Sequence, residues 1–251
     1  MNSIFKAVFA TTWKRKESKL FLVFSLMPFL YLMTTFMKTS FMNIIPTEAN
    51  LQFSFLEMYD GIFNLTFNST LPSLALFLLV LSVFKKEIQE HQLFLYKDIE
   101  RGKILVAKLM SLLLILVIYL LLFSICMAGV YYLRVVHLPY GSGELLGTEG
   151  LLALFSVFGT MMVQVTYVFA LTLFSFLMSP VAGMISGIGL VVISTVLPLL
   201  GQVGFLFPSG YRLLAEKGEF TLAYLGCTTV TLCILLPCFW MSLNKFRKVE
   251  F

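Results

Sequence analysis

FKKEIQEHQLFLYKDIERGK, residues 84–103, is the only long run in the middle of the chain that mixes charged residues with regularly spaced apolar ones. An apolar segment that can cross a bilayer flanks it on each side, at residues 71–84 and 104–133. A charged stretch between two such segments lies in water beside the membrane. The sequence is therefore organised around a membrane-side segment that also carries apolar side chains.

The composition of the whole chain is that of a polytopic membrane protein. Of the 251 residues, 59% are hydrophobic and only 12% are charged, and the mean hydropathy is +0.93. Soluble domains carry about 25% charged residues, so most of this surface faces lipid. The four cysteines lie inside apolar segments without a paired spacing, and we expect neither a disulfide nor a metal site from them.

Apolar segments and their interruptions predict one all-α domain over residues 1–251. Residues 1–19 predict an amphipathic helix in the membrane interface, with a plain basic flank as the alternative. Residues 38–67 predict a loop that partly dips into the outer leaflet, and residues 201–220 a re-entrant segment broken at Pro208-Ser209-Gly210. Six membrane-spanning helices are predicted, at residues 20–37, 71–84, 104–133, 150–178, 182–200 and 221–243.

The positive charges predict the orientation of these spans. Six spans place both termini on one side, and fourteen of the 18 Lys and Arg residues lie on that side, residues 85–103 included. By the positive-inside rule, both termini and residues 85–103 are cytoplasmic and the chain lies in the plasma membrane. The net charge of +5 follows from this distribution, and no nucleic-acid partner is expected.

The charged stretch predicts a helix that needs a partner. Its apolar face is broad, and apolar residues on the water side need burial at the membrane surface or in a groove of another protein, which we favour. Catalytic, phosphate-binding and metal-binding motifs are absent from it, so no catalytic residue and no metal ligand is predicted. In a helix from Glu87 to Tyr96, one face would carry Ile88, His91, Gln92 and Leu95, and the apolar surface would be broadened by Leu93, Phe94 and Tyr96.

These features together resemble the type-2 ABC exporter permeases, in particular the small six-span permeases of lantibiotic and antimicrobial-peptide export and immunity. The resemblance rests on the six spans, the N-terminal helix, the broken segment before the last span, and a loop in which Glu87 precedes Ile99-Glu100-Arg101-Gly102-Lys103 by about a dozen residues. It implies a coupling helix that docks on a separate ATP-binding subunit. The implied coupling residues are Glu87, Ile88, His91, Leu93, Phe94, Leu95, Arg101 and Lys103.

The resemblance also implies partners. The chain has no Gly-x-x-x-x-Gly-Lys-Ser/Thr motif, so two copies of an ATP-binding subunit would supply ATP and Mg²⁺, and this chain would hold no cofactor itself. A second permease, identical or homologous, would complete the pathway. Lys108, five residues into the third span, is expected to extend toward the cytoplasmic face as an anchor or to take part in coupling.

Small and polar residues within the spans indicate two further sites. Gly183 and Gly187 are four residues apart and predict close helix packing, either with a second permease or with a helix of the same chain. Most polar residues at depth satisfy helix contacts, but some would line a substrate pathway that is otherwise apolar and rich in Phe and Met. These pathway residues are Gln164, Tyr167, Ser194 and Thr195.

The sequence thus predicts a transporter subunit rather than an enzyme. We expect it to move an amphipathic or hydrophobic cargo, such as an antimicrobial or toxin-like peptide, out of the cell. The alternative is the membrane substrate-binding component of an importer, which should show a polar pocket formed by its outer loops. An intramembrane enzyme is excluded because the predicted spans contain no His, Asp or Glu.

Overall fold

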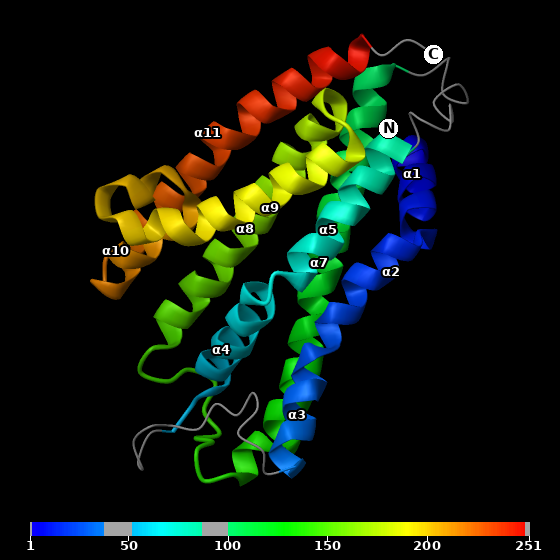
Figure 1. Ribbon diagram of the computed structural model, residues 1–251. Coiled ribbons are helices and arrows are strands. Elements are labelled where there is room, and N and C mark those ends of the chain that lie inside the picture. The colour runs from blue at the N-terminus through cyan, green and yellow to red at the C-terminus, as the bar shows by residue number, and fades with distance from the viewer. Residues whose placement is uncertain (1, 38–51, 87–99, 249–251) are drawn as a thin grey trace.

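The computed structural model describes residues 2–37, 52–86 and 100–248, and within them the chain is a bundle of long helices (Figure 1). Five of the described helices are long and apolar enough to cross a membrane, or six if one bent pair counts as a single span. The chain is therefore an all-α polytopic membrane protein, as predicted.

The first span is preceded by a separate short helix. The helix α1 (Asn2–Lys14) ends at Arg15, whose backbone is extended with φ −65° and ψ 144°, and α2 (Lys16–Val23) begins immediately after it. A short 3-10 turn, η1 (Phe24–Leu26), joins α2 to α3 (Met27–Met37) just before Pro28. Proline lacks an N–H, so the helix tightens there. The helix α1 packs on α7, and its place in the membrane interface stays a prediction.

The predicted second span, residues 71–84, forms the second half of a bent pair of helices. Residues 38–67 were expected to form a loop, but α4 (Phe55–Asn68) is a regular helix that starts with a capping box between Ser54 and Glu57. After a break of two residues follow α5 (Leu71–Leu81) and the π-helical turn η2 (Ser82–Lys86), bent by 60° relative to α4. For residues 55–67 the expected loop is wrong, because this segment is a helix that buries an apolar face. Its polar residues lower the hydropathy, so hydropathy alone did not indicate the helix.

The remaining predicted spans are confirmed as helices to within a few residues. The long helix α7 (Arg101–Leu133) leads through the 3-10 turn η4 (Val135–His137) and a loop to α8 (Gly150–Leu177). Ser179 caps α9 (Pro180–Val196) by accepting a hydrogen bond from the Ala182 amide. The last helix is α11 (Phe220–Arg247).

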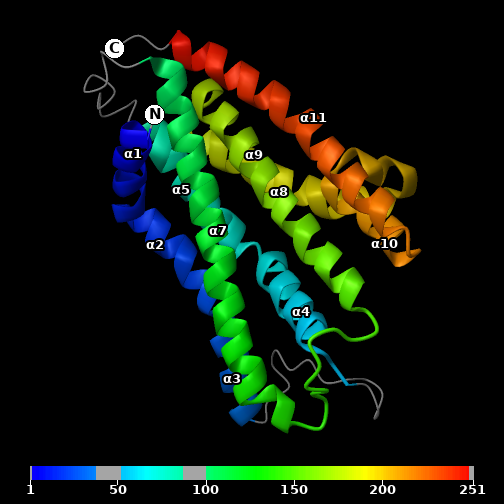
Figure 2. The same ribbon diagram turned by 180° about the vertical axis from the view of Figure 1, so that it is seen from behind.

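The segment before α11 is broken, as the sequence predicts, and contains only short helical turns. These are η5 (Leu197–Leu206), η6 (Pro208–Tyr211) and α10 (Arg212–Glu216), with a break at Phe207 and a positive φ of 64° at Gly201. Figures 1 and 2 show this segment folded back beside the lower end of α11. Whether it re-enters the membrane stays a prediction.

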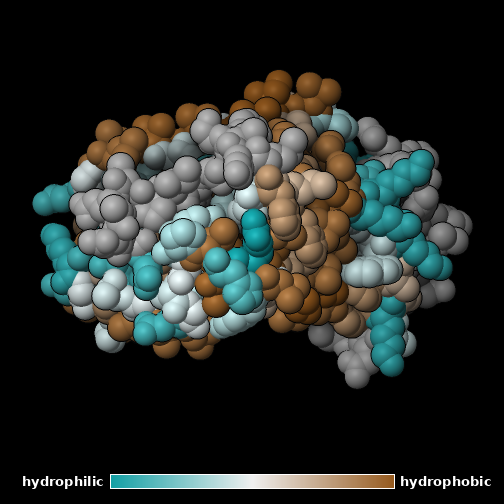
Figure 3. Space-filling view, turned by 90° about the horizontal axis from the view of Figure 1, so that it is seen from below, coloured by the Kyte–Doolittle hydropathy of each residue, from teal (hydrophilic) through white to brown (hydrophobic). Residues whose placement is uncertain are grey.

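Both ends of the described chain lie at one end of the bundle. The start of α1, the end of α5, the start of α7 and the end of α11 meet there (Figures 1 and 2). Seen from the opposite end, hydrophobic residues make up much of the surface, and hydrophilic residues gather mainly toward its two sides (Figure 3). The prediction that this meeting point is cytoplasmic remains a prediction from the positive charges.

The core lies between α5, α7 and α8 and the helices packed on them, and aromatic rings fill much of it. Phe21 stacks on Tyr119 with ring centroids 4.7 Å apart, and Phe63 meets Phe123 edge-on at 5.1 Å. The outward faces of α9 and α11 are different. In the most apolar stretch of each of these two segments, only 17% of the residues are buried inside the chain, which leaves their apolar faces to lipid or to another subunit.

Candidate substrate pocket

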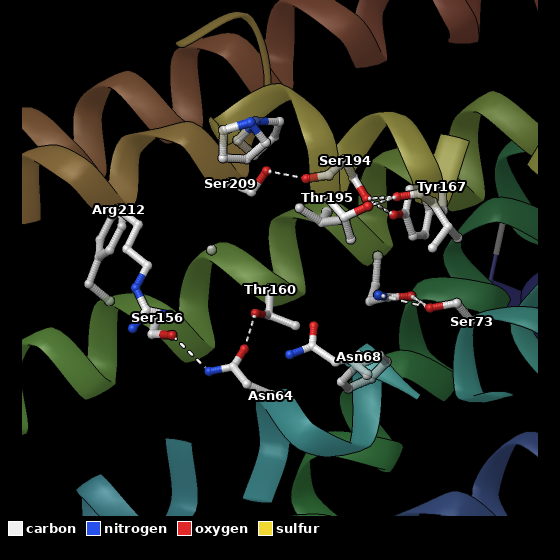
Figure 4. A pocket seen from close by; sticks show the side chains of 18 of the residues that line it. Asn64, Asn68, Ser73, Ser156, Thr160, Tyr167, Ser194, Thr195, Ser209 and Arg212 are labelled. Atoms are coloured by element: carbon white, nitrogen blue, oxygen red, sulfur yellow. Dashed lines mark hydrogen bonds between the residues drawn. The ribbon is translucent and has the colours of Figure 1, made fainter. Parts of the chain in front are cut away.

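A cavity of about 460 Å³ lies where α4 bends into α5, enclosed by α8, α9 and the segment η5–η6 (Figure 4). Polar side chains from all of these elements line it, together with a smaller set of apolar ones. The polar lining residues are Asn64, Asn68, Ser73, Ser156, Thr160, Gln164, Tyr167, Ser194, Thr195, Ser209 and Arg212.

The bend between α4 and α5 forms one edge of the cavity. Thr70 adopts the left-handed conformation with φ 62°, which is unusual for a β-branched residue, and α5 follows with Pro72 in its first turn. The polar run Asn68-Ser69-Thr70 and this proline together interrupt the helix. A broken helix is tolerated at membrane depth only where protein or a water-lined cavity surrounds the freed backbone groups. The cavity meets that condition.

Asn64 fastens α4 to α8 at the floor of the cavity. Its side-chain amide donates to Ser156 Oγ at 2.9 Å and accepts from Thr160 Oγ1 at 3.0 Å, as Figure 4 shows. The same amide nitrogen donates to the carboxylate of Asp60, one turn earlier on α4. Asn64 therefore holds the two helices together at a polar point within otherwise apolar surroundings.

The outer end of the cavity carries charge. Arg212 lines it and forms an exposed salt bridge with Glu216, with Nε and Oε1 3.1 Å apart. Asp60 lies close enough to Arg212 for the two charges to interact. An acidic residue on a candidate span was not expected, and it arises because α4 is a helix rather than a loop.

The inner end of the cavity holds a buried amide that the protein only partly satisfies. Gln164 is 2% exposed, and its Oε1 and Nε2 each lie 3.4 Å from Ser73 Oγ. An amide side chain offers two donors and two acceptor positions. Even if both of these long bonds form, one N–H and one acceptor position remain for a ligand or for water.

Hydrogen bonds also fasten α9 and η6 to this inner end. The Tyr167 hydroxyl pairs with Ser194 Oγ, and Ser209 Oγ donates to the Ser194 carbonyl at 3.0 Å. These bonds link α8, α9 and η6 in one row along the wall of the cavity (Figure 4). The inner wall is thus fixed by side chains from three elements.

The structure brings together all four residues predicted for the substrate pathway, because Gln164, Tyr167, Ser194 and Thr195 line the same cavity. That a cargo passes them stays a prediction. The lining is mixed: many polar side chains contribute, but most of its surface is apolar. Of the Phe and Met residues expected in the pathway, Phe67 and Phe155 line it and no methionine does.

Several residues of the cavity were missed by the sequence interpretation. Asn64 and Asn68 were placed in a loop, and Ser209 and Arg212 in the outer segment. A signal for the first two existed. Asp60, Asn64 and Asn68 are spaced four residues apart behind the capping box of Ser54, which predicts a helix with one polar face.

The residues predicted for coupling are only partly described. Glu87, Ile88, His91, Leu93, Phe94 and Leu95 lie outside the described residues. Arg101 donates from Nη1 to the Arg247 carbonyl, and Lys103 forms an exposed salt bridge with Glu100 at 3.0 Å. Arg101 thus joins the start of α7 to the end of α11, a contact that the sequence did not indicate.

The two glycines predicted for dimer packing are buried within the chain. A Cβ at Gly183 would lie 3.2 Å from Leu81 Cδ2, and one at Gly187 would lie 2.7 Å from Phe77 Cδ2. The close approach is therefore to α5 of the same chain, which was the alternative interpretation. Packing of a second permease on α9 stays a prediction.

The expectation that Lys108 extends toward the cytoplasmic face is wrong. The side chain is 2% exposed and points inward, where its Nζ donates to the Val83 carbonyl at 3.0 Å. The ammonium group is held by a buried carbonyl of η2 (Ser82–Lys86) and does not reach the surface.

Comparison with known proteins adds no family: no family model matches the chain, and no curated protein and no solved structure is significantly similar to it. The fold and the cavity define the class by themselves. The chain is an all-α membrane protein with several helices that can cross a bilayer and a polar cavity between them.

Proposed function

We propose that the chain is the membrane-spanning permease subunit of an ATP-driven exporter and that the cavity at the α4–α5 bend is part of its cargo pathway. The observation that carries the proposal is the position of this cavity. Its volume of about 460 Å³ falls within the range of small-molecule sites. Transporters often place such sites at broken helices near the middle of the bilayer.

The lining supports a cargo that is amphipathic. The side-chain amides of Asn68 and Gln164 offer paired donors and acceptors, while Phe67, Phe155 and Leu199 offer apolar surface. A peptide presents both kinds of group, and an antimicrobial or toxin-like peptide is the cargo that the family resemblance suggests. Only part of such a peptide would fit the cavity at one time.

The remaining parts of the proposal rest on the sequence. Two copies of an ATP-binding subunit dock on residues 85–103, and a second permease, identical or homologous, completes the pathway in the plasma membrane. Both termini are cytoplasmic. The contact of Arg101 with the last turn of α11 supports a role at this end, because it ties the segment after the coupling stretch to another span.

One observation favours a second candidate, the membrane substrate-binding component of an importer. Such a component should present a polar pocket to the outer side, and Ser209 and Arg212 from the segment before α11 contribute to this cavity. A small water-soluble ligand held by the chain alone would favour this candidate over export of a peptide.

The test is co-purification from the native membrane in mild detergent, with mass spectrometry of the proteins and ligands that stay bound. Gln164→Leu should lose the bound ligand and keep the ATP-binding subunit, because it removes the amide from the cavity alone. Leu93→Asp with Phe94→Asp should lose the ATP-binding subunit and keep the fold. The matched control is Gln202→Leu, the same change at an exposed residue outside the cavity.

Two outcomes would contradict the proposal. If wild-type chain brings down no ATP-binding subunit, the exporter assignment is lost. If Gln164→Leu retains the ligand as well as Gln202→Leu does, the cavity is not the binding site.

A further inference from the structure

Lys108 is a fully buried cation in the second turn of an apolar helix. Besides its bond to the Val83 carbonyl, its Nζ lies 5.4 Å from the centroid of the Phe84 ring. Burying an ammonium group among apolar helices costs free energy unless good partners are present. An ionisable residue inside a membrane bundle is therefore a candidate for a specific role.

A second cation reaches the same place from another element. Arg15 lies at the break between α1 and α2, and its Nη1 donates to the Ser82 carbonyl at 2.8 Å. Ser82 and Val83 are consecutive residues of the π-helical turn η2. Two cations from separate parts of the chain thus hold adjacent carbonyls of one turn.

The bonds to η2 are made to backbone carbonyls by charged donors on two other elements, at the last described turn before residues 87–99. Carbonyls at a helix end carry partial negative charge. Hydrogen bonds from cations to them are strong where the surroundings are apolar.

The turn also lies at a mechanically important position. It follows α5 and reaches Lys86, the last described residue before 87–99, and the start of α5 carries Ser73 in the wall of the cavity. The eleven residues of α5 span about 16 Å at the rise of an α-helix. One short, rigid helix therefore separates the two cations from the cavity.

We propose that Arg15 and Lys108 are positioning residues that clamp η2, the turn directly after α5, to the α1–α2 junction and to α7. A displacement of the chain beyond Lys86 then moves all three elements together and reaches the cavity through α5. The inference rests on the proposed function only for the source of that displacement, the ATP-binding subunit. The clamp itself is a property of the chain alone.

The first test is a double-mutant cycle on the full chain in lipid nanodiscs, with the apparent melting temperature as readout. Arg15→Gln and Lys108→Met should each lower it, and the double variant should lose less than the sum, because either cation holds the turn less well without the other. The control is Lys16→Gln, because Lys16 is an exposed neighbour of Arg15. Its effect on the melting temperature should simply add to that of Lys108→Met. Additive losses for Arg15→Gln and Lys108→Met would overturn the clamp.

The second test is hydrogen exchange at Ser82–Lys86, measured in the same nanodiscs. Arg15→Gln should raise the exchange rate about tenfold, the effect of losing one hydrogen bond from a charged donor. Arg15→Lys, which keeps a cationic donor, should restore much of the protection. The comparison of Arg15→Gln with Arg15→Lys tests the clamp even if Lys108→Met fails to fold. Unchanged exchange in Arg15→Gln would contradict the clamp.

A third readout separates a positioning role from a merely structural one. In membranes that contain the ATP-binding subunit, Arg15→Gln should keep that subunit bound and keep ATP hydrolysis. It should lose the effect of ATP on the rate at which a cysteine in the cavity, Thr195→Cys, reacts with a thiol reagent. Arg15→Lys should restore the effect. Retention of the ATP effect in Arg15→Gln would overturn the transmission role. If the wild-type chain binds no ATP-binding subunit, the proposed function fails and the first two tests still decide the clamp.

Discussion

Gly187 and Gly189 lie two residues apart on α9 and face different surroundings. A Cβ at Gly187 would lie 2.7 Å from Phe77 Cδ2 and 3.1 Å from Leu171 Cδ2, whereas one at Gly189 would have no neighbour within 4 Å. Phe77 is fully buried and meets the Tyr167 ring edge-on at 5.4 Å. The ring therefore has little room to move, and a shift would reach the wall of the cavity.

We therefore predict that adding one methyl group lowers the stability of the chain at Gly187 but not at Gly189. Gly187→Ala should destabilise the chain by about 1–3 kcal/mol, the usual cost of overpacking a filled core. Gly189→Ala should be neutral or stabilise it by up to about 1 kcal/mol, because alanine is the better helix former. Apparent melting temperatures in one detergent compare them. Equal shifts would show that Gly187 does not pack on α5 as described.

For single residues, the sequence indicated which polar side chains line the cavity better than it indicated their hydrogen-bond partners. Gln164 and Tyr167 stood out because a polar side chain is costly in an apolar span, and both line the cavity. Ser73, the partner of Gln164, and Asn64, which joins α4 to α8, could not be assigned, since their role depends on which helices pack together. The inward direction of Lys108 was missed for the same reason, because its acceptor lies on another helix.

Among the elements, α4 is held at its outer start by a carboxylate with two functions. Glu57 Oε2 accepts from the Ser54 amide at 2.9 Å, and its Oε1 accepts from the Glu149 amide, also at 2.9 Å. The first bond caps α4, and the second fastens it to the connection between α7 and α8. Backbone pairing beside it, from Phe53 N to Tyr140 O at 2.8 Å, supports the same junction.

Removing this carboxylate should loosen α4 as a unit. We predict that Glu57→Ala lowers stability by about 1–2 kcal/mol, the usual cost of losing a helix cap, and speeds hydrogen exchange in the first turns of α4. Glu144→Ala is the matched control, because this exposed side chain lies in the same connection. If the two variants behave alike, Glu57 does not fasten α4.

Hydropathy predicts the long apolar helices but not α4. The spans α7, α8 and α11 are long and almost purely apolar, so their existence follows from composition and length. The helix α4 carries Asp60, Asn64 and Asn68 along one side, which lowers its hydropathy. Its stability comes from contact with α8, and tertiary contact is not visible in a hydropathy pattern.

For the whole molecule, the bundle has two distinct ends. The start of α1, the end of α5, the start of α7 and the end of α11 share one end, and η6 and α10 lie in the other half of the bundle (Figure 1). Ser209 of η6 and Arg212 of α10 line the cavity. The clamp of Arg15 and Lys108 lies at the first end, and Ser73 joins α5 to the cavity. In the proposed mechanism, a subunit that acts at the first end changes the cavity without touching it.

The most direct test of this account is the labelling of Thr195→Cys by a membrane-impermeant thiol reagent added from outside. Thr195 is exposed and lines the cavity, and the four native cysteines would first be changed to alanine. In native membranes we predict that ATP changes the labelling rate severalfold. The pair Leu93→Asp and Phe94→Asp should abolish the effect of ATP and leave the basal rate unchanged. A labelling rate that ATP does not alter in the otherwise unchanged chain would contradict the account.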